Sequence, residues 1–351
     1  LLSNIFVSKW ESVLTTTLLA IVFMYSLTVL VGFLGQISLV QWGISGFAAY
    51  VMIRLMADGT KIRPTDFVTN SGWGWPTILA FLAAIVVAVI LGLLIGIPAL
   101  RIRGVQLAVV TIAAVIAIEN MLLRNVPLMG AGSVSVNPTP EPYWFGQYVG
   151  GFNPNTARND YWKFSLFLII VAALLGIGVA NLRRGQIGRR FLAIRANERA
   201  ASASGINVAN MKLLGFGISS GIAAIAGCLM AYKLPGLQET QFEVFGGLAL
   251  LAFVYLGGIT TIWGAIVGGC LMAGGLLPEF LGVHFESIDK GLINAVGAIG
   301  LIVNAKVTNG EGIALLQTDL VKNTLAALRR PPDDEVDADN ADDLETHEAT
   351  A

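Results

Sequence analysis

Cysteine, histidine and charge are scarce in this sequence. Its 351 residues include two cysteines and two histidines, and only 13% of them are charged. Cys228 and Cys270 each lie in an apolar stretch without the paired spacing of a metal site, so we expect two buried side chains and neither a disulfide nor a metal. No G-x-x-x-x-G-K-S/T loop occurs. The chain is therefore expected not to bind or hydrolyse ATP and to carry no cofactor of its own.

Long apolar stretches dominate instead. The chain is 55% hydrophobic with 40 glycines, and its mean hydropathy of +0.72 is too high for a soluble fold. The stretches 12–31, 77–100 and 213–232 contain no charged residue. About 20 apolar residues in a helix cross a hydrocarbon core roughly 30 Å thick. The predicted fold class is all-α: a polytopic helical membrane protein with about eight to ten transmembrane segments, some of them short or broken.

Nine membrane segments can be placed along residues 1–305, followed by a tail. A turn at Gly257–Thr261 divides the uncharged stretch 244–277 into two segments. Segments two, seven and nine are short and glycine-rich, as in helices packed inside a bundle. The tail, 306–351, is acidic and predicted to be disordered from about residue 331. The nine segments are about 12–31, 37–56, 77–98, 105–123, 164–182, 212–232, 244–257, 264–281 and 289–305.

Basic residues predict the orientation of these segments. Six arginines fall between residues 183 and 199, within the loop 183–211 that joins segments five and six. Arg101 and Arg103 join segments three and four. Both loops fall on the same side, which the positive-inside rule places in the cytoplasm together with the C-terminus. The loop 124–162 has almost no Lys or Arg and is expected to face outward.

The start of the chain fits this orientation less well. The same count places Leu1, Arg54, Lys61 and Arg63 outside, against the rule. We therefore expect either a missing upstream segment or a stretch 12–56 that does not form two simple spans. Leu1 in place of Met agrees with a chain that is processed, trimmed or cut from a longer one. Nine of the 23 acidic residues lie in the last 21 residues, so the rest of the chain carries 22 basic against 14 acidic residues.

Apolar residues recur at helical spacing within the loop 183–211. Ile187, Phe191 and Ile194 would lie on one face of an amphipathic helix. The stretch RAASASG then places small side chains on a short helix that Gly205 can end. Another protein can approach such a helix closely, whereas the surrounding arginines also favour contact with anionic lipid headgroups. Spacing alone leaves both interpretations open.

This stretch resembles the cytoplasmic coupling loop of ABC-importer permeases. The pattern of that loop is Glu-Ala-Ala, three residues, then Gly. Arg199 stands where Glu is usual in the pattern, and Glu198 lies one place early. The resemblance implies contact with an ATPase for six residues: Asn197, Glu198, Arg199, Ala200, Ala201 and Gly205.

Further motifs resemble one branch of that class, the permease subunits of branched-chain amino acid importers (LivM type). The first two signatures match GFLGQISLVQWGISGFAAY (32–50), with Gln41 where His is common, and PALRIRGVQLAVVTIA (98–113), with Gln106 where Tyr is common. The arginine-rich stretch and YLGGITTIWGAIVGG (255–269) resemble the next two. The likeness covers about residues 12–305 and leaves out the acidic tail.

The resemblance implies the membrane subunit of an ABC importer in the cell (inner or plasma) membrane. Residues 1–305 would form the permease domain. A second, homologous permease subunit would complete the pathway, two ATPase subunits would bind the ATP, and an extracytoplasmic binding protein would deliver the solute. Branched-chain amino acids are the main substrates of that family, with urea, short amides and other amino acids among close relatives. No nucleic-acid binding is expected, because the arginines lie between membrane spans.

Polar residues at apparent membrane depth are the candidates for the solute pathway. Such residues often face a bundle interior, although Ser and Thr also donate to a carbonyl of their own helix. Gln36 and Gln41 have side-chain amides, which need partners outside their own helix. The predicted pathway residues are Gln36, Ser38, Gln41, Ser45 and Thr111.

Other classes of protein compete with this interpretation. A secondary transporter driven by an ion gradient would explain a faint repeat between LGQISLVQWG (34–43) and LGGITTIWG (256–264). Such a carrier usually needs an intramembrane carboxylate, for which Glu119 is the only candidate. A purely structural anchor leaves the motifs unexplained. The hydrolase pattern G-x-S-x-G at 217–221 falls within an apolar helix, where Gly217 and Gly221 are expected to allow close helix packing.

Overall fold

The computed structural model describes residues 2–56, 75–100, 105–123, 143–144, 147–148, 161–233, 239–272 and 274–284. Segment nine, the tail, Arg101, Arg103 and most of the loop 124–162 lie outside these residues. Within them the chain is helical, apart from the short pair β1 (Tyr143–Trp144) and β2 (Gln147–Tyr148), which lie antiparallel with Tyr143 opposite Tyr148.

The helices follow the apolar stretches of the sequence. In chain order they are α1 (Leu2–Leu27), the π-helical η1 (Thr28–Phe33), α2 (Val40–Met56), α3 (Thr77–Ala99), α4 (Val105–Ala117), the π-helical η2 (Ile118–Leu123), α6 (Tyr161–Arg184), α7 (Gln186–Ala196), α8 (Glu198–Ala203), α9 (Val208–Lys233), the 3-10 helix η3 (Glu239–Phe242), α10 (Val244–Gly257), α11 (Ile262–Leu271) and α12 (Leu276–His284).

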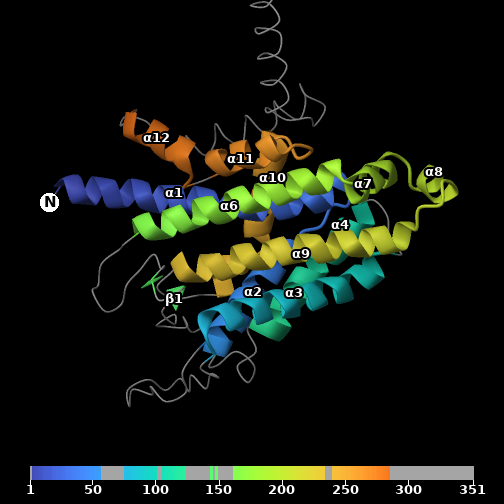
Figure 1. The fold of residues 1–351 in the computed structure, drawn as a ribbon, viewed down its shortest axis with the longest axis horizontal. Helices are drawn as coiled ribbons and strands as arrows, with labels where there is room; N and C mark the ends of the chain where they lie inside the picture. Colours follow the sequence, from blue (N-terminus) through green and yellow to red (C-terminus); the bar gives the residue numbers. More distant parts are fainter. Residues whose placement is uncertain are drawn as a thin grey trace, which may run out of the picture.

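The described helices form a bundle around α1. Most residues of the stretch Lys9–Phe33 are buried, and α1 packs against α6, α9 and α11. α2 packs against α9, α3 and α4. α1, α6, α9 and α3 run along the long axis of the molecule, with the N-terminus and α12 at one end and α7 and α8 at the other (Figure 1).

Six helical stretches in the described part are long and apolar enough to cross a membrane, which confirms the all-α, polytopic fold class. Shorter helices lie among them. α2, the predicted segment two, is mostly buried inside the bundle, as expected for a short segment. α10, the predicted segment seven, is less enclosed, because Phe245 is 79% exposed. The six stretches are Lys9–Phe33, Thr77–Ala99, Gln106–Leu123, Trp162–Arg184, Val208–Lys233 and Ile262–Gly282.

Two glycine breaks interrupt the bundle and touch one another. η1 ends before Gly35, which has a φ of +74°, and α10 ends at Gly258, which has a φ of +110°. Both values lie in the left-handed region that glycine adopts without a steric penalty. A Cβ added to Gly32 would lie 2.0 Å from the carbonyl oxygen of Ile259, so the two breaks pack backbone to backbone. The predicted turn at Gly257–Thr261 is thus confirmed.

The glycines of the hydrolase-like pattern pack helices together. α9 is continuous from Val208 to Lys233, so the pattern has no strand–turn–helix setting. A Cβ on Gly217 would lie 3.2 Å from Leu93 Cδ2, and one on Gly221 would lie 3.4 Å from Val89 Cγ2, both on α3. The predicted close packing is confirmed. Because the later glycine of α9 meets the earlier residue of α3, the two helices run antiparallel.

Segment eight is confirmed as one membrane-length stretch, Ile262–Gly282, but its helix is interrupted. The sequence predicts one span over 264–281, but α11 ends at Leu271 and α12 starts at Leu276. Gly274 has a φ of +78°, and the backbone N–H of Leu276 donates to Thr17 Oγ1 at 3.0 Å. The Thr17 hydroxyl of α1 thus accepts the hydrogen bond that a backbone carbonyl would accept in an uninterrupted helix. Apolar periodicity does not reveal such a tertiary partner.

Candidate functional site

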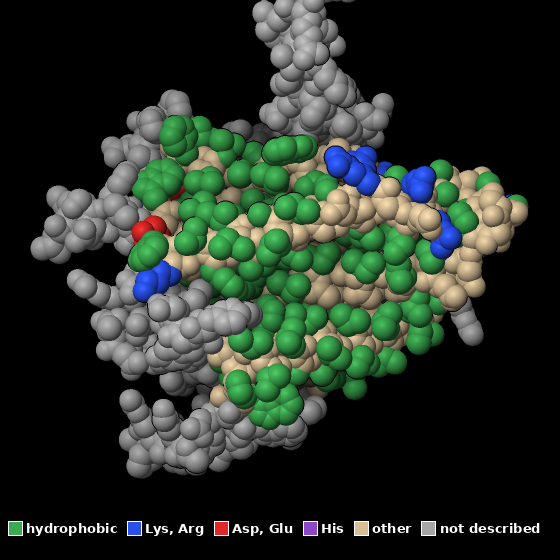
Figure 2. Space-filling model, viewed as in Figure 1, with side chains coloured by type: hydrophobic (Ala, Val, Ile, Leu, Met, Phe, Trp, Pro, Cys, Tyr) green, Lys and Arg blue, Asp and Glu red, His purple; other side chains and the backbone are tan. Residues whose placement is uncertain are grey.

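The arginine-rich stretch folds as two short helices at one end of the bundle. We call α7 and α8 the helical arm. Lys and Arg side chains gather where the arm meets the bundle, whereas the face along α6, α9 and α3 is almost entirely hydrophobic (Figure 2). On α6 that face includes the exposed residues Leu166, Ile170, Leu174 and Ile177. A charged end next to an apolar wall is the arrangement of a membrane protein at the water boundary.

α7 packs on the bundle through the face that the sequence predicts. Phe191 and Ile194 are buried, at 0% and 2% exposure, and Ile187 is partly buried. Gly188 is buried as well, and a Cβ there would lie 2.2 Å from the carbonyl oxygen of Leu182. α7 therefore turns back tightly on the end of α6.

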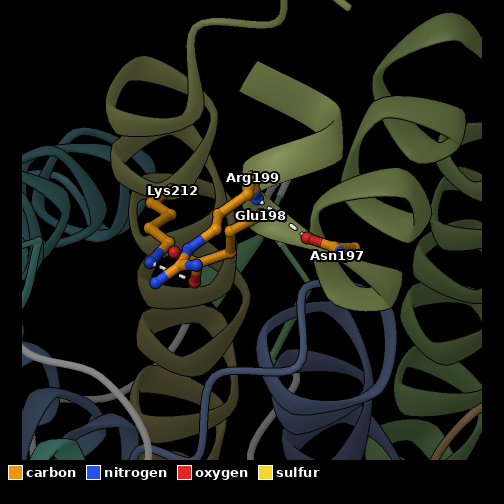
Figure 3. Close-up of polar contacts among 4 residues, drawn as sticks. All are labelled: Asn197, Glu198, Arg199 and Lys212. Carbon is orange, nitrogen blue, oxygen red and sulfur yellow. Dashed lines mark hydrogen bonds and ion pairs between the residues drawn. The ribbon is translucent and has the colours of Figure 1, made fainter. Parts of the chain in front are cut away.

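α8 is a single turn and a half with a well-defined cap at each end. The Asn197 side chain accepts hydrogen bonds from the backbone N–H of Arg199 at 3.0 Å and of Ala200 at 3.2 Å (Figure 3). This is the N-cap geometry that satisfies otherwise unpaired amides. Gly205, with a φ of +80°, ends the turn, as predicted. Capping at both ends holds this short helix in shape, although an isolated helix of this length would not be stable.

A buried ion pair joins α8 to α9. Glu198 Oε1 lies 2.6 Å from Lys212 Nζ, and the Lys212 side chain is only 3% exposed (Figure 3). A buried ammonium group is costly unless a charged partner compensates it. Glu198 therefore has a partner inside the chain, and its contact with an ATPase stays a prediction.

The small side chains of α8 divide into two sets. Ala201 is 4% exposed, so its methyl group already packs inside the chain and is not presented to a partner as predicted. Arg199, Ala200, Ser202 and Ala203 are exposed. The surface that α8 offers to another protein is thus the Arg199–Ala200 and Ser202–Ala203 side.

Arg195 connects the arm to the first glycine break. Its guanidinium group donates a hydrogen bond from Nη1 to the carbonyl oxygen of Gly32. A Cβ on Gly35 would lie 2.8 Å from Arg195 Cγ, so the arginine stem lies against the glycine of positive φ. The last turn of α7 therefore touches the point at which the helix after α1 is interrupted.

The predicted pathway residues surround this break. Gln36, Ser38 and Gln41 are buried, at 5%, 0% and 0% exposure. Among the described residues, Gln36 Oε1, Ser38 Oγ and both polar atoms of the Gln41 amide have no hydrogen-bond partner. Buried polar groups normally have partners. Three polar side chains that keep unused hydrogen-bonding capacity at a helix break are typical of a route for polar solutes or water.

The other two predicted pathway residues have local partners. Thr111 donates to the carbonyl oxygen of Ala108 at 2.9 Å and accepts from the backbone N–H of Leu39 at 3.3 Å, which fixes the break against α4. Ser45 donates to the carbonyl oxygen of Trp42 at 2.7 Å and also lines a cavity between α1, α2, α9 and α10. The five residues therefore do not line one common cavity.

Sequence reasoning missed Arg195 and the lysines Lys212 and Lys233. Arg195 was one of six arginines in a basic loop, and nothing in its spacing marks it as the one that reaches Gly32. Lys212 and Lys233 lie at the two ends of an uncharged stretch, where a lysine side chain is expected to reach the membrane–water interface. Their position at either end of a buried span is the signal that could have drawn attention to them. In the described residues, no cluster of three potential metal ligands occurs.

Comparison with known proteins identifies the family. A family described as the branched-chain amino acid transport system permease component matches residues 10–276. The chain is 28% identical over 276 residues to the high-affinity branched-chain amino acid transport system permease protein LivM of Escherichia coli (strain K12), covering 74% of this chain and 60% of LivM. It thus spans about three-fifths of the length of that relative.

Two further relatives match parts of the chain. The permease protein LivH of the same organism is 26% identical over 267 residues, covering 74% of this chain and 82% of LivH. The xylose transport system permease protein XylH of Escherichia coli (strain K12) is 31% identical over 148 residues, covering 38% of this chain and 36% of XylH. No solved structure matches the chain. Because the family match covers most of the helical bundle, the chain belongs to the family of branched-chain amino acid transport system permease components.

Proposed function

We propose that this chain is the membrane-spanning permease subunit of an ABC importer. It would form the pathway for small polar solutes, foremost branched-chain amino acids, while separate ATPase subunits bind and hydrolyse ATP. Family membership and the similarity to LivM, a permease protein of branched-chain amino acid transport, support the class of transporter and solute. The observation that carries the mechanism is the contact of the helical arm, through Arg195, with the glycine break at Gly32–Gly35.

The arm is built to transmit movement. α8 is capped by Asn197 and fixed to α9 by the Glu198–Lys212 ion pair, and α7 is anchored by Phe191 and Ile194. An ATPase that moves α8 would therefore move α7 with it, because only Asn197 separates the two helices. Through Arg195 the movement reaches a stretch that has no helical hydrogen-bond ladder to resist it. Opening and closing around Gln36, Ser38 and Gln41 would follow.

The partners of this importer are part of the proposal. They are a second, homologous permease subunit, two ATPase subunits and an extracytoplasmic substrate-binding protein. LivM and LivH, both similar to this chain, are named as permease proteins of the same kind of transport system, which supports pairing of two permeases. The bilayer would surround the exposed apolar faces of α3 and α6, in whose stretches Thr77–Ala99 and Trp162–Arg184 few residues are buried.

Orientation follows from the charge of the arm. Arg183 and Arg184 end α6, and Arg189, Arg190 and Arg199 are exposed on the arm. The positive-inside rule supports a multi-pass protein of the cell membrane with this end, and the C-terminus, in the cytoplasm. An ATPase in the cytoplasm would then face α8 directly.

Crowding the exposed small side of α8 tests the coupling role. Ala200→Trp and Ala203→Trp add volume that a packed interface cannot absorb without strain, so ATP-driven uptake should fall at least about tenfold. Less ATPase should co-purify, while the amount of chain in the membrane should not change. Ala201 is unsuitable for this test, because a Trp there would disrupt the arm itself.

The matched control is Leu174→Trp. Leu174 is 64% exposed on the apolar face of α6, where a Trp should be tolerated. If α8 only lies on lipid headgroups, a Trp at that level is also tolerated. Wild-type uptake and undiminished ATPase association in both α8 variants would therefore contradict the coupling role.

A further inference from the structure

A cavity lies inside the bundle between α1, α2, α9 and α10. Its volume is about 110 Å³. Leu19 and Phe23 of α1, Trp42 of α2 and Met230 of α9 are among the apolar residues that line it. Phe23 and Trp42 meet edge to face, with ring centroids 5.0 Å apart. A single water needs roughly 10–15 Å³, so the space is large enough for a small solute.

One charged side chain lines this apolar cavity. Lys233 is the last residue of α9, which runs from the arm to the opposite end of the bundle (Figure 1). Its ammonium group contacts Thr16 Oγ1 and donates to the carbonyl oxygen of Ser12 at 3.4 Å. The described residues that line the cavity include no acid, and no ion pair of Lys233 occurs among the described residues.

An ammonium group held only by neutral oxygens is poorly compensated in an apolar setting. Thr16 Oγ1 itself donates to the carbonyl oxygen of Ser12 at 2.8 Å, so the two oxygens orient the lysine. A lysine has three N–H donors, and these two contacts use two of them. Among the described residues the third has no acceptor, and an anionic acceptor would also supply the missing charge.

We propose that this cavity binds a small carboxylate that carries a compact apolar group. The carboxylate would pair with Lys233, which Thr16 and Ser12 hold in place. The apolar group would lie against Phe23, Trp42 and Met230. Apolar walls with one oriented polar group are the usual composition of small-molecule sites.

The position of the cavity gives it a place in transport. Trp42 and Ser45 belong to the first turns of α2, directly after the break at Gly35. At the wall, Gly227 lies so close to α2 that an added Cβ would be 1.9 Å from the carbonyl oxygen of Ser45. α9 and α2 are therefore in backbone contact at this wall of the cavity. Its role as a stage on the pathway rests on the proposed function, whereas its binding chemistry does not.

Protection of a cysteine in the cavity wall tests the proposal. Met230→Cys is placed in a chain whose native cysteines are replaced (Cys228→Ala, Cys270→Ala), and the full chain is labelled in membrane vesicles. Because Lys233 concentrates anions near it, the anionic reagent sulfonatoethyl methanethiosulfonate should react at least about tenfold faster than the cationic aminoethyl reagent. Lys233→Met should remove this preference, and Lys233→Arg should keep it.

The probes are L-leucine, isocaproate and L-leucinamide. The first two share the carboxylate and the apolar group and should slow labelling, whereas the amide, which lacks the carboxylate, should not. Equal protection by all three probes, or by none, would overturn the proposal. Labelling rates that are the same with and without a positive charge at residue 233 would overturn it as well. Lys163→Met, on α6 outside the cavity, is the control and should change nothing. The labelling needs neither ATP nor partners, so its failure is distinct from a failure of the importer assignment.

Discussion

Lys212 is the residue on which the position of α8 depends. Its side chain lies 3% exposed at the start of α9 and meets Glu198 of α8 at 2.6 Å. A buried pair of this kind adds little by itself, but removing one partner leaves the other charge buried and uncompensated. The pair therefore fixes the arm mainly by making its detachment costly.

Glu198→Gln should destabilise the chain. It leaves the Lys212 ammonium without a counter-charge, and the expected loss in the free energy of unfolding is about 3 kcal/mol. The measurement is thermal or denaturant unfolding of the purified chain in detergent. A double variant, Glu198→Gln with Lys212→Met, should recover part of the loss, since no buried charge remains.

Lys9→Met is the matched control for this prediction. Lys9 also forms an ion pair, with Glu279 at 2.5 Å, but its side chain is 49% exposed. Exposed pairs contribute about 0–1 kcal/mol. Equal effects of Glu198→Gln and Lys9→Met would contradict the view that burial makes the first pair important.

At the scale of elements, the arm and the glycine breaks form one connected unit. α7 contacts the bundle through a buried face, and its last turn reaches the break at Gly32–Gly35 through Arg195. The second break, at Gly258, packs directly on the first. Under the proposed function, a displacement of α7 would reach both interrupted helices through these contacts.

Arg195→Ala should uncouple ATP hydrolysis from transport. The variant loses the hydrogen bond to Gly32 and the stem that packs on Gly35, but it leaves α8 and its exposed side intact. ATPase subunits should still co-purify and hydrolyse ATP, while uptake per ATP falls by about tenfold, equal to about 1.4 kcal/mol of coupling. Both rates are measured in the same proteoliposomes.

Arg189→Ala controls for the loss of positive charge. Arg189 lies on the same helix and is exposed. It should leave the ratio of uptake to hydrolysis unchanged. An equal fall in both arginine variants would show that the charge of the arm, rather than the contact with the break, matters.

The elements were largely predictable because each has a local cause. Apolar stretches of membrane length predict α1, α3, α6 and α9, and the spacing of Phe191 and Ile194 predicts the buried face of α7. Gly205 predicts the end of α8. These features depend on neighbours within one or two helical turns, which periodicity captures.

The contacts that make the site were not predictable in the same way. Arg195 meets Gly32 across 163 positions of sequence, and Leu276 meets Thr17 across 259. Ala201 matches the coupling pattern but is buried, on the helix that Glu198 ties to Lys212 of α9. A pattern of residue types gives the helix and its length, whereas its rotation depends on tertiary partners.

At the scale of the whole molecule, the face in Figure 2 has an extensive apolar side and a group of basic side chains at the end with the arm. α3 and α6 expose their apolar faces, and the arm lies at the opposite end of the bundle from the N-terminus (Figure 1). The exposed sides are available to lipid or to a second permease subunit, and the basic end is available to ATPases.

Cysteines at the two ends of the bundle should label from opposite sides of the membrane. Ser202 is exposed on α8, and Lys163 is exposed near the start of α6, whose 24 residues span about 36 Å. In intact cells an impermeant thiol reagent should reach Lys163→Cys, and it should reach Ser202→Cys only after lysis. Labelling of both in intact cells would contradict the orientation derived from the arginines.

The most direct test of the central claim is the energy source for uptake. The chain is reconstituted in proteoliposomes with its partner permease, ATPases and binding protein, and uptake of labelled leucine is followed. ATP on the side of α8 and binding protein on the other side should both be required, and uptake should persist when ionophores collapse the proton and sodium gradients. Uptake without ATP that follows either ion gradient, and that is abolished by Glu119→Gln, would contradict the account and indicate a secondary transporter.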